Sequence, residues 1–391
     1  MHAAPLRRPM SARDPREPGR ASSSLELLFD LVFVTAVASA GTQLHQGVVA
    51  GQWSALGGFA MTFFAIWWAW MNYTWFASAY DNDDVGFRVL TFVIMGGALI
   101  LAAGTPELFA SGQSPVVVAG YAVMRFGMAL LWLRAAKGDP ARRRVALTYA
   151  GGISLVQLLW ILRLALPEER FVAASFVALV VAELAVPMVA ERREHTPFHP
   201  DHVADRAGGM TMIVLGEVVL ATVVATQTVL AGGWGGSGVT LDLVLLVTGV
   251  FLVVVATWWL YFRRELTDLA GHPRRVWAFG YLHYFLYASI AATGAGVTAG
   301  VEVATHDAHV SAGAVEWLVG GAAAVFVLTV GVLHRLGGDS VRRCLLPGAV
   351  VAVLVLVIAA AGPSVGVGVL LTGLVLIATV VVNQVWDRAI S

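Results

Sequence analysis

Long apolar runs recur along nearly the whole chain, and they constrain its fold more than any other feature. Two examples are LDLVLLVTGVFLVVVATWWLYF at 241–262 and CLLPGAVVAVLVLVIAAAG at 344–362. As helices, these runs are long enough to cross a hydrocarbon layer of roughly 30 Å. Only 13% of the residues are charged, whereas soluble domains have about 25%, so the charges are too few to cover a water-facing surface. The sequence therefore predicts an all-α integral membrane protein.

Polar or Gly/Pro-containing stretches divide the apolar sequence into twelve expected membrane-spanning segments. These lie near 24–47, 54–77, 88–108, 115–134, 145–166, 171–190, 209–231, 239–262, 276–301, 312–333, 344–361 and 364–385. Residues 1–23 are rich in arginine and proline and lack the short apolar core of a signal peptide. They are expected to form a disordered cytosolic tail, and 191–206 a polar cytosolic linker.

The placement of basic residues predicts the orientation of these segments. With the N-terminus inside, the segments expected to be cytosolic hold 22 of the 25 arginines and lysines. The remaining three are Arg125, Arg163 and Arg170. This asymmetry is what the positive-inside bias produces for an even number of spans. We therefore expect a multi-pass protein of the cell (inner) membrane with both termini in the cytosol.

Two sequence features recur at one fixed shift and indicate an internal repeat. Glu26 and Glu217 are 191 residues apart, and so are the Trp-Trp pairs that begin at Trp67 and Trp258. Six spans per copy make both copies cross the membrane in the same direction, which predicts a parallel duplication. The two six-helix repeats would cover 24–190 and 207–391.

Two acids, Glu26 and Asp30, interrupt the apolar run SLELLFDLVFVTAVA at 24–38. Four residues apart, they lie on one face of a helix, and each charge inside a bilayer costs roughly 2.5–3.5 kcal/mol. Glu26 has two interpretations, because Ser23 three residues earlier would form a capping box with it, whereas the repeat makes it the counterpart of Glu217. Capping does not explain Asp30, which we expect to face the protein interior.

Arg125 lies in the middle of the segment VVVAGYAVMRFGMALLWL, too deep to reach either membrane surface comfortably. It is expected to pair with a carboxylate, either Asp30 or Glu183, or to bind an anion. Glu183 precedes Pro187 by four residues, and this proline frees a backbone carbonyl and is expected to kink the helix. Local polar packing is the alternative explanation of Glu183.

His283 lies among tyrosines in YLHYFLYA. It is either a neutral histidine in a polar seam or a proton relay, since imidazole has an unperturbed pKa near 6.5. His195, His199 and His202 in the linker do not have a convincing metal-ligand spacing. Nucleotide-binding loops and the HExxH and GxSxG motifs are also missing from the sequence.

The sequence resembles the low temperature requirement protein A family of bacterial membrane proteins. The likeness rests on LELLFDLVFV (25–34), WWAWMNYTWFASAYDNDD (67–84), HVADRAGGMTMIVLGEVVL (202–220), WWLYF (258–262) and YLH (281–283). One departure is Asp205-Arg206, where the family pattern resembles Glu-Arg. The resemblance implies a multi-pass membrane protein linked by name to growth in the cold, without a settled biochemical activity.

Duplicated spans with buried ionisable groups favour a secondary transporter that couples a small solute to protons. Two alternatives are a membrane-embedded enzyme acting on a lipid or apolar metabolite by acid–base chemistry and a non-catalytic sensor or scaffold. The bilayer and an unknown small solute or lipid are the expected partners, with no nucleic acid, and cofactors stay undetermined. The expected ion- or substrate-binding residues are Glu26, Asp30, Arg125, Glu183, Glu217 and His283, with no metal site.

Overall fold

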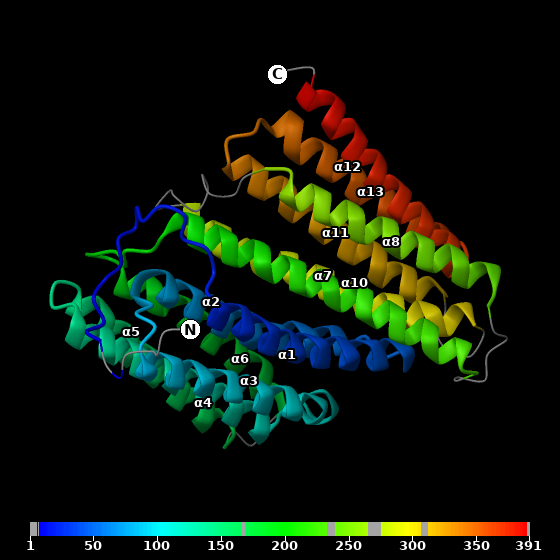
Figure 1. The fold of residues 1–391 in the computed structure, drawn as a ribbon. Helices are drawn as coiled ribbons and strands as arrows, with labels where there is room; N and C mark the ends of the chain where they lie inside the picture. Colours follow the sequence, from blue (N-terminus) through cyan, green and yellow to red (C-terminus); the bar gives the residue numbers. More distant parts are fainter. Residues whose placement is uncertain are drawn as a thin grey trace. The chain divides into compact units, whose positions relative to one another are not determined.

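The computed structural model describes residue 6 and residues 8–165, 169–232, 239–264, 275–305 and 312–388, with the backbone alone for 169–172. Within these ranges the regular structure is entirely helical (Figure 1). The twelve helices are α1 (Ser24–Val49), α2 (Ala55–Tyr80), α3 (Val85–Ser111), α4 (Pro115–Gly138), α5 (Arg143–Arg163), α6 (Glu169–Ala190), α7 (Pro200–Leu230), α8 (Leu241–Phe262), α10 (Arg275–Ala304), α11 (Ala312–Leu336), α12 (Val341–Ala361) and α13 (Val365–Arg388).

Eleven of these described helices are long and apolar enough to cross a membrane, which makes this a multi-pass helical membrane protein. Each of the twelve expected spans corresponds to a helix, but α2 is not among the eleven. Its second half, WWAWMNYTWFASAY, is rich in Trp, Tyr and Asn, which lowers its hydropathy. Residues 66–80 of α2 are all buried, so these polar groups face protein instead of lipid. The reduced hydropathy of α2 therefore reflects its burial within the protein.

Helix ends follow local capping chemistry. The carboxylate of Asp84 accepts a hydrogen bond from the Phe87 N–H at 2.7 Å at the start of α3, and Thr240 caps α8 in the same way. Gly112 ends α3 at φ 74°, a left-handed conformation that glycine adopts without strain. Ser114 then caps α4, whose first residue is Pro115. These signals explain why the span boundaries were largely predictable.

The chain divides into two compact units. Unit 1 comprises residues 1–39 and 64–206, and unit 2 comprises residues 40–63 and 207–391. Residues 40–63 thus group with the second unit, although the expected repeat places them in the first half. The two Trp-Trp pairs also differ, because Trp67 is 3% exposed and Trp258 is 43% exposed. The predicted equivalence of the two halves stays a prediction.

Small residues bring helices into close contact within each unit. In unit 1, α3 and α4 cross where a side chain added at Gly97 would meet the Gly120 carbonyl oxygen at 2.7 Å. In unit 2, α8 and α13 run side by side (Figure 1), and a side chain added at Gly373 would meet the Gly249 carbonyl oxygen at 2.8 Å. Close approach at small residues is how membrane helices gain packing contacts where lipid removes the hydrophobic driving force.

Candidate functional site

Four ionisable side chains meet in the interior of unit 1. Glu26 and Asp30 come from α1, and His202 and Arg206 come from α7. Each pair is four residues apart, so each occupies one face of its helix. All four side chains are at most 1% exposed. We call these four residues the charge cluster.

The cluster is held by direct contacts of two carboxylates with a guanidinium and an imidazole. Arg206 Nη2 lies 2.6 Å from Asp30 Oδ1, and Arg206 Nη1 lies 4.0 Å from Glu26 Oε1. His202 Nε2 lies 3.0 Å from the same Glu26 oxygen. One guanidinium therefore faces two carboxylates, and the histidine adds a second contact to one of them.

Aromatic side chains enclose the cluster. The Trp70 indole N–H donates to Asp30 Oδ1 at 2.7 Å. The Arg206 guanidinium carbon lies 5.9 Å from the ring centres of both Trp70 and Phe29, a distance at which cation–π attraction operates. These contacts join the buried face of the first half of α1 to the aromatic half of α2 within unit 1.

Glu26 is both a helix cap and a member of the cluster. Its Oε2 accepts hydrogen bonds from the Ser23 backbone N–H at 2.8 Å and the Ser23 hydroxyl at 2.9 Å. The Glu26 N–H in turn lies 3.3 Å from the Ser23 hydroxyl oxygen. This reciprocal pattern is the capping box that the sequence predicted. Because Oε1 turns toward His202 and Arg206, the two interpretations of Glu26 hold together.

The charges of the cluster do not balance without a proton. Glu26 and Asp30 bring two negative charges, and Arg206 brings one positive charge that it keeps at all physiological pH values. With neutral His202 the net charge is −1, and one added proton on the histidine or a carboxylate makes it zero. Low dielectric favours the neutral form, because an uncompensated buried charge is costly. One added proton would therefore neutralise the cluster.

Two charged residues flank the cluster just outside the spans. Arg20 donates to the carbonyl oxygens of Ala77 and Ser78 at 2.8 and 2.7 Å. Burial raises the pKa of Asp81 to about 6, and the negative charge of Glu26 acts in the same direction. Arg20 and ionised Asp81 cancel each other, so the requirement for one proton is unchanged. Asp81 adds a nearby group that titrates close to neutral pH.

Apart from the Glu26–His202 contact, four polar atoms in the cluster have no hydrogen-bond partner among the described residues: Asp30 Oδ2, His202 Nδ1, Arg206 Nε and Arg206 Nη1. Buried polar atoms without partners are rare in folded proteins. The cluster thus offers one carboxylate acceptor, two arginine donors and one imidazole nitrogen on the buried side chains of α1 and α7.

A second buried ion pair lies elsewhere in unit 1, between α4 and α6. Arg125 Nη2 contacts Glu183 Oε2 at 2.6 Å, with both side chains at most 1% exposed. Glu183 also accepts hydrogen bonds from the Tyr121 hydroxyl at 2.9 Å and the Trp68 indole at 3.0 Å. The expected contact of Arg125 with a carboxylate is confirmed, and of the two candidate acids the partner is Glu183. The charges of the Arg125–Glu183 pair balance, so this pair does not require a proton.

The remaining two predicted site residues lie in unit 2. His283 is buried, with Nδ1 2.6 Å from the Phe279 carbonyl oxygen and Nε2 2.9 Å from the Tyr261 hydroxyl. A carbonyl only accepts, so Nδ1 carries a proton and Nε2 is free to accept from Tyr261, which is the polar-seam arrangement. Glu217 is half-buried and makes no hydrogen bond or ion pair within the described ranges. Its equivalence with Glu26 stays a prediction.

Sequence reasoning did not select His202 and Arg206, because it placed both in the linker 191–206. The structure begins α7 at Pro200, well before the expected start near 209. Proline is favoured at the first position of a helix, and the i, i+4 spacing of His202 and Arg206 matches that of the two acids. Those two signals together could have identified the pair.

Metal ligation finds no support at the linker histidines. His195 is 68% exposed and approaches Glu191 at 3.5 Å, while His199 contacts the Glu17 carbonyl oxygen at 2.7 Å. Among the residues that the structure places, no group of three or more His, Cys, Asp or Glu side chains is arranged to hold a metal ion.

Comparison with known proteins places this geometry in context. A family model described as bacterial low temperature requirement A protein (LtrA) matches residues 21–383. The chain is similar to the uncharacterized protein RA0937 of Rhizobium meliloti (strain 1021), with 30% identity over 247 residues. The aligned stretch covers 61% of this chain and 57% of that relative. No solved structure matches the chain.

Proposed function

Since the chain belongs to the bacterial low temperature requirement A family and is a multi-pass helical membrane protein, we propose that it is a proton-coupled secondary transporter of a small solute. One observation carries this proposal: the charge cluster lies inside membrane-spanning helices and requires one proton for neutrality. Ionisable residues buried in spans are costly and commonly mark proton or ion pathways.

The coupling follows from the two charge states of the cluster. With its proton, the cluster is neutral and stable in low dielectric. Without the proton it carries one net negative charge, which favours either reprotonation or binding of a compensating polar or cationic group. The unpartnered donors of Arg206 and the free Asp30 oxygen are the atoms that such a solute would contact. Proton and solute then influence each other's binding, which is the requirement for coupled transport.

The orientation belongs to the same proposal. We place both termini and residues 191–199 in the cytosol of a bacterial cell, with the protein in the cell membrane, because 22 of 25 basic residues then lie in the cytosolic segments or at the cytosolic ends of the spans. Cysteine scanning tests this, since Cys344 is buried and is the single native cysteine. A cysteine placed at position 194 should react with a membrane-impermeant maleimide only after the cells are opened. Labelling in intact cells would contradict the proposed topology.

Transport is tested with purified full-length protein in proteoliposomes that contain a pH-sensitive dye. A panel of amino acids, sugars, organic acids and polyamines is added outside, and both internal pH and internal solute are measured. The proposal predicts at least one compound that enters chemically unchanged together with protons. If a compound is instead converted into a product, the membrane-enzyme alternative replaces the transporter proposal. Growth of a deletion strain in the cold supplies a cellular readout for the same compounds.

A further inference from the structure

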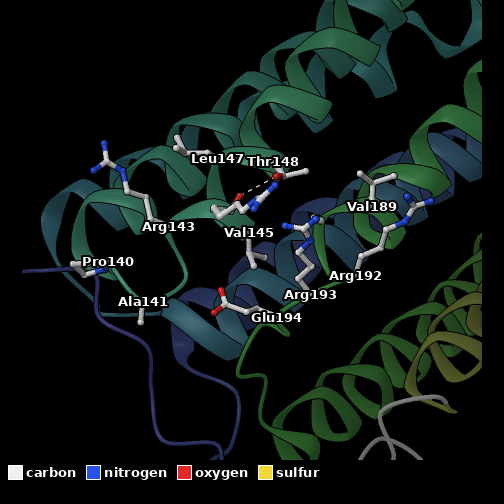
Figure 2. A pocket seen from close by; sticks show the side chains of 12 residues that line it. Pro140, Ala141, Arg143, Val145, Leu147, Thr148, Val189, Arg192, Arg193 and Glu194 are labelled. Atoms are coloured by element: carbon white, nitrogen blue, oxygen red, sulfur yellow. Dashed lines mark hydrogen bonds between the residues drawn. The ribbon is translucent and has the colours of Figure 1, made fainter.

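A cavity of about 1010 Å³ opens in unit 1 where α5 begins and α6 ends (Figure 2). Four arginines line it: Arg143 and Arg144 from the first turn of α5, and Arg192 and Arg193 from the residues just after α6. We call this the arginine pocket. It contains none of the residues of the charge cluster, so its role is separate from proton coupling.

The arginine pocket concentrates positive charge that its lining only partly compensates. In the part of the chain that the structure describes, none of its four arginines forms an ion pair, whereas neighbouring Arg142 contacts Asp139 at 3.1 Å. Glu194 is the one acid in the lining, which leaves an excess of three positive charges. Like charges gathered around a concave surface repel one another unless an anion joins them. The pocket is therefore suited to an anionic ligand with several acceptor oxygens, such as a phosphate group.

The depth of the pocket indicates what the anion is attached to. Arg143 is the first residue of a membrane-spanning helix, and Arg192 follows the last turn of its neighbour α6. One turn further in, Leu147 and Val189 also line the pocket, and they are 44% and 46% exposed. The outward apolar faces continue along both helices through Leu155 at 60% and Val181 at 61% exposure. The arginine pocket thus adjoins a lipid-facing apolar surface.

We propose that the arginine pocket binds the phosphate headgroup of an anionic phospholipid, with its acyl chains along the outer faces of α5 and α6. Basic pockets between membrane helices are established sites for acidic lipid headgroups. A free inorganic phosphate shares the headgroup chemistry, but it would leave the adjoining apolar surface without a role.

The proposal is tested by native mass spectrometry of the full-length protein in detergent, titrated with phosphatidylglycerol or phosphatidylcholine. The wild type should bind phosphatidylglycerol in preference to phosphatidylcholine. The double variants R143Q/R144Q and R192Q/R193Q should each weaken phosphatidylglycerol binding about 25-fold, because each basic residue near an anionic headgroup contributes about fivefold. All four positions are exposed, so the variants should stay folded. Their thermal unfolding midpoints check this.

Arg342 and Arg343 supply a matched control. They are an exposed arginine pair in the first turn of α12, and they do not line the arginine pocket. R342Q/R343Q removes the same charge and should change phosphatidylglycerol binding less than twofold. If R342Q/R343Q weakened phosphatidylglycerol binding as much as the pocket variants, the weakening would come from general surface charge. That result would overturn the proposal.

Two further outcomes also decide the question. If inorganic phosphate at millimolar concentration displaces phosphatidylglycerol from the wild type, the site recognises free phosphate and the lipid assignment fails. If the glutamine variants do not accumulate, R192K/R193K keeps the charge and loses only the two-pronged geometry of arginine. This variant should show a smaller but measurable weakening, and unchanged binding would contradict the site.

Discussion

In the buried Arg125–Glu183 pair, removing the acid and removing the base should lower the stability of the protein by different amounts. Changing Glu183 to Gln leaves the Arg125 guanidinium charged and without its carboxylate, at a site that is at most 1% exposed. Arginine cannot release its proton in proteins, so the full penalty of an unpaired buried charge applies. We expect Glu183→Gln to lower the free energy of unfolding by about 3–5 kcal/mol, with no relief between pH 5 and pH 7.

Arg125→Leu should behave differently. The Glu183 carboxylate that remains keeps its hydrogen bonds from Tyr121 and Trp68, and it can become neutral by taking up a proton. For an ordinary glutamic acid, taking up a proton at pH 7 costs about 3.7 kcal/mol, and at pH 5 it costs about 1 kcal/mol. The loss of stability in Arg125→Leu should therefore reach at most roughly 4 kcal/mol at pH 7. It should shrink by about 2–3 kcal/mol at pH 5.

The measurement is reversible unfolding in mixed detergent micelles at both pH values. The double variant R125L/E183Q removes both charges and should be more stable than E183Q alone. The exposed pair of Arg88 and Asp83, with a separation of 2.7 Å and exposures of 38% and 56%, is the matched control, and R88L should cost less than about 1 kcal/mol. If R88L and R125L cost the same, or if R125L shows no dependence on pH, the argument from desolvation is wrong.

Two further predictions concern the titrating acids. The pKa of Asp81 is raised to about 6 by burial and by the charge of Glu26, so the folded state binds a proton more tightly than the unfolded state. Stability should therefore fall by roughly 2–3 kcal/mol as the pH rises from 4 to 7 and then level off. Asp81→Asn should reduce this dependence of stability on pH, measured by unfolding at several pH values. If the dependence is unchanged, another group causes it. If Glu217 is the functional counterpart of Glu26, Glu217→Gln should abolish proton-coupled uptake at normal abundance, and a fully active variant would limit the coupling site to unit 1.

Most of the fold could be predicted because hydropathy, capping residues and glycine positions act locally. Each of the twelve expected spans became a helix, since a chain in a bilayer must satisfy its backbone hydrogen bonds within each segment. The start of α7 was the main error of position, at Pro200 instead of near 209. Polar residues such as His202 and Arg206 lowered the local hydropathy, and the sequence alone does not reveal the acids that compensate them.

The site was predicted in part for a related reason. Asp30 and Arg125 stood out because a lone charge in an apolar run needs a partner, and both have one in the structure. The identity of each partner depends on which helices pack together, which periodicity does not determine. The arginine pocket illustrates the same limit, since Arg143 and Arg192 lie 49 residues apart in the sequence and form one surface only when α5 lies against α6.

Proton coupling at the charge cluster is tested most directly by Glu26→Gln in proteoliposomes, with the solute identified in the panel. Gln preserves the capping box with Ser23 and removes one negative charge, so the cluster becomes neutral without a proton. We expect uptake driven by a pH gradient to fall at least tenfold, while exchange of labelled for unlabelled solute at equal pH continues. Uptake that still follows the pH gradient in this variant would contradict the proposed role of the cluster.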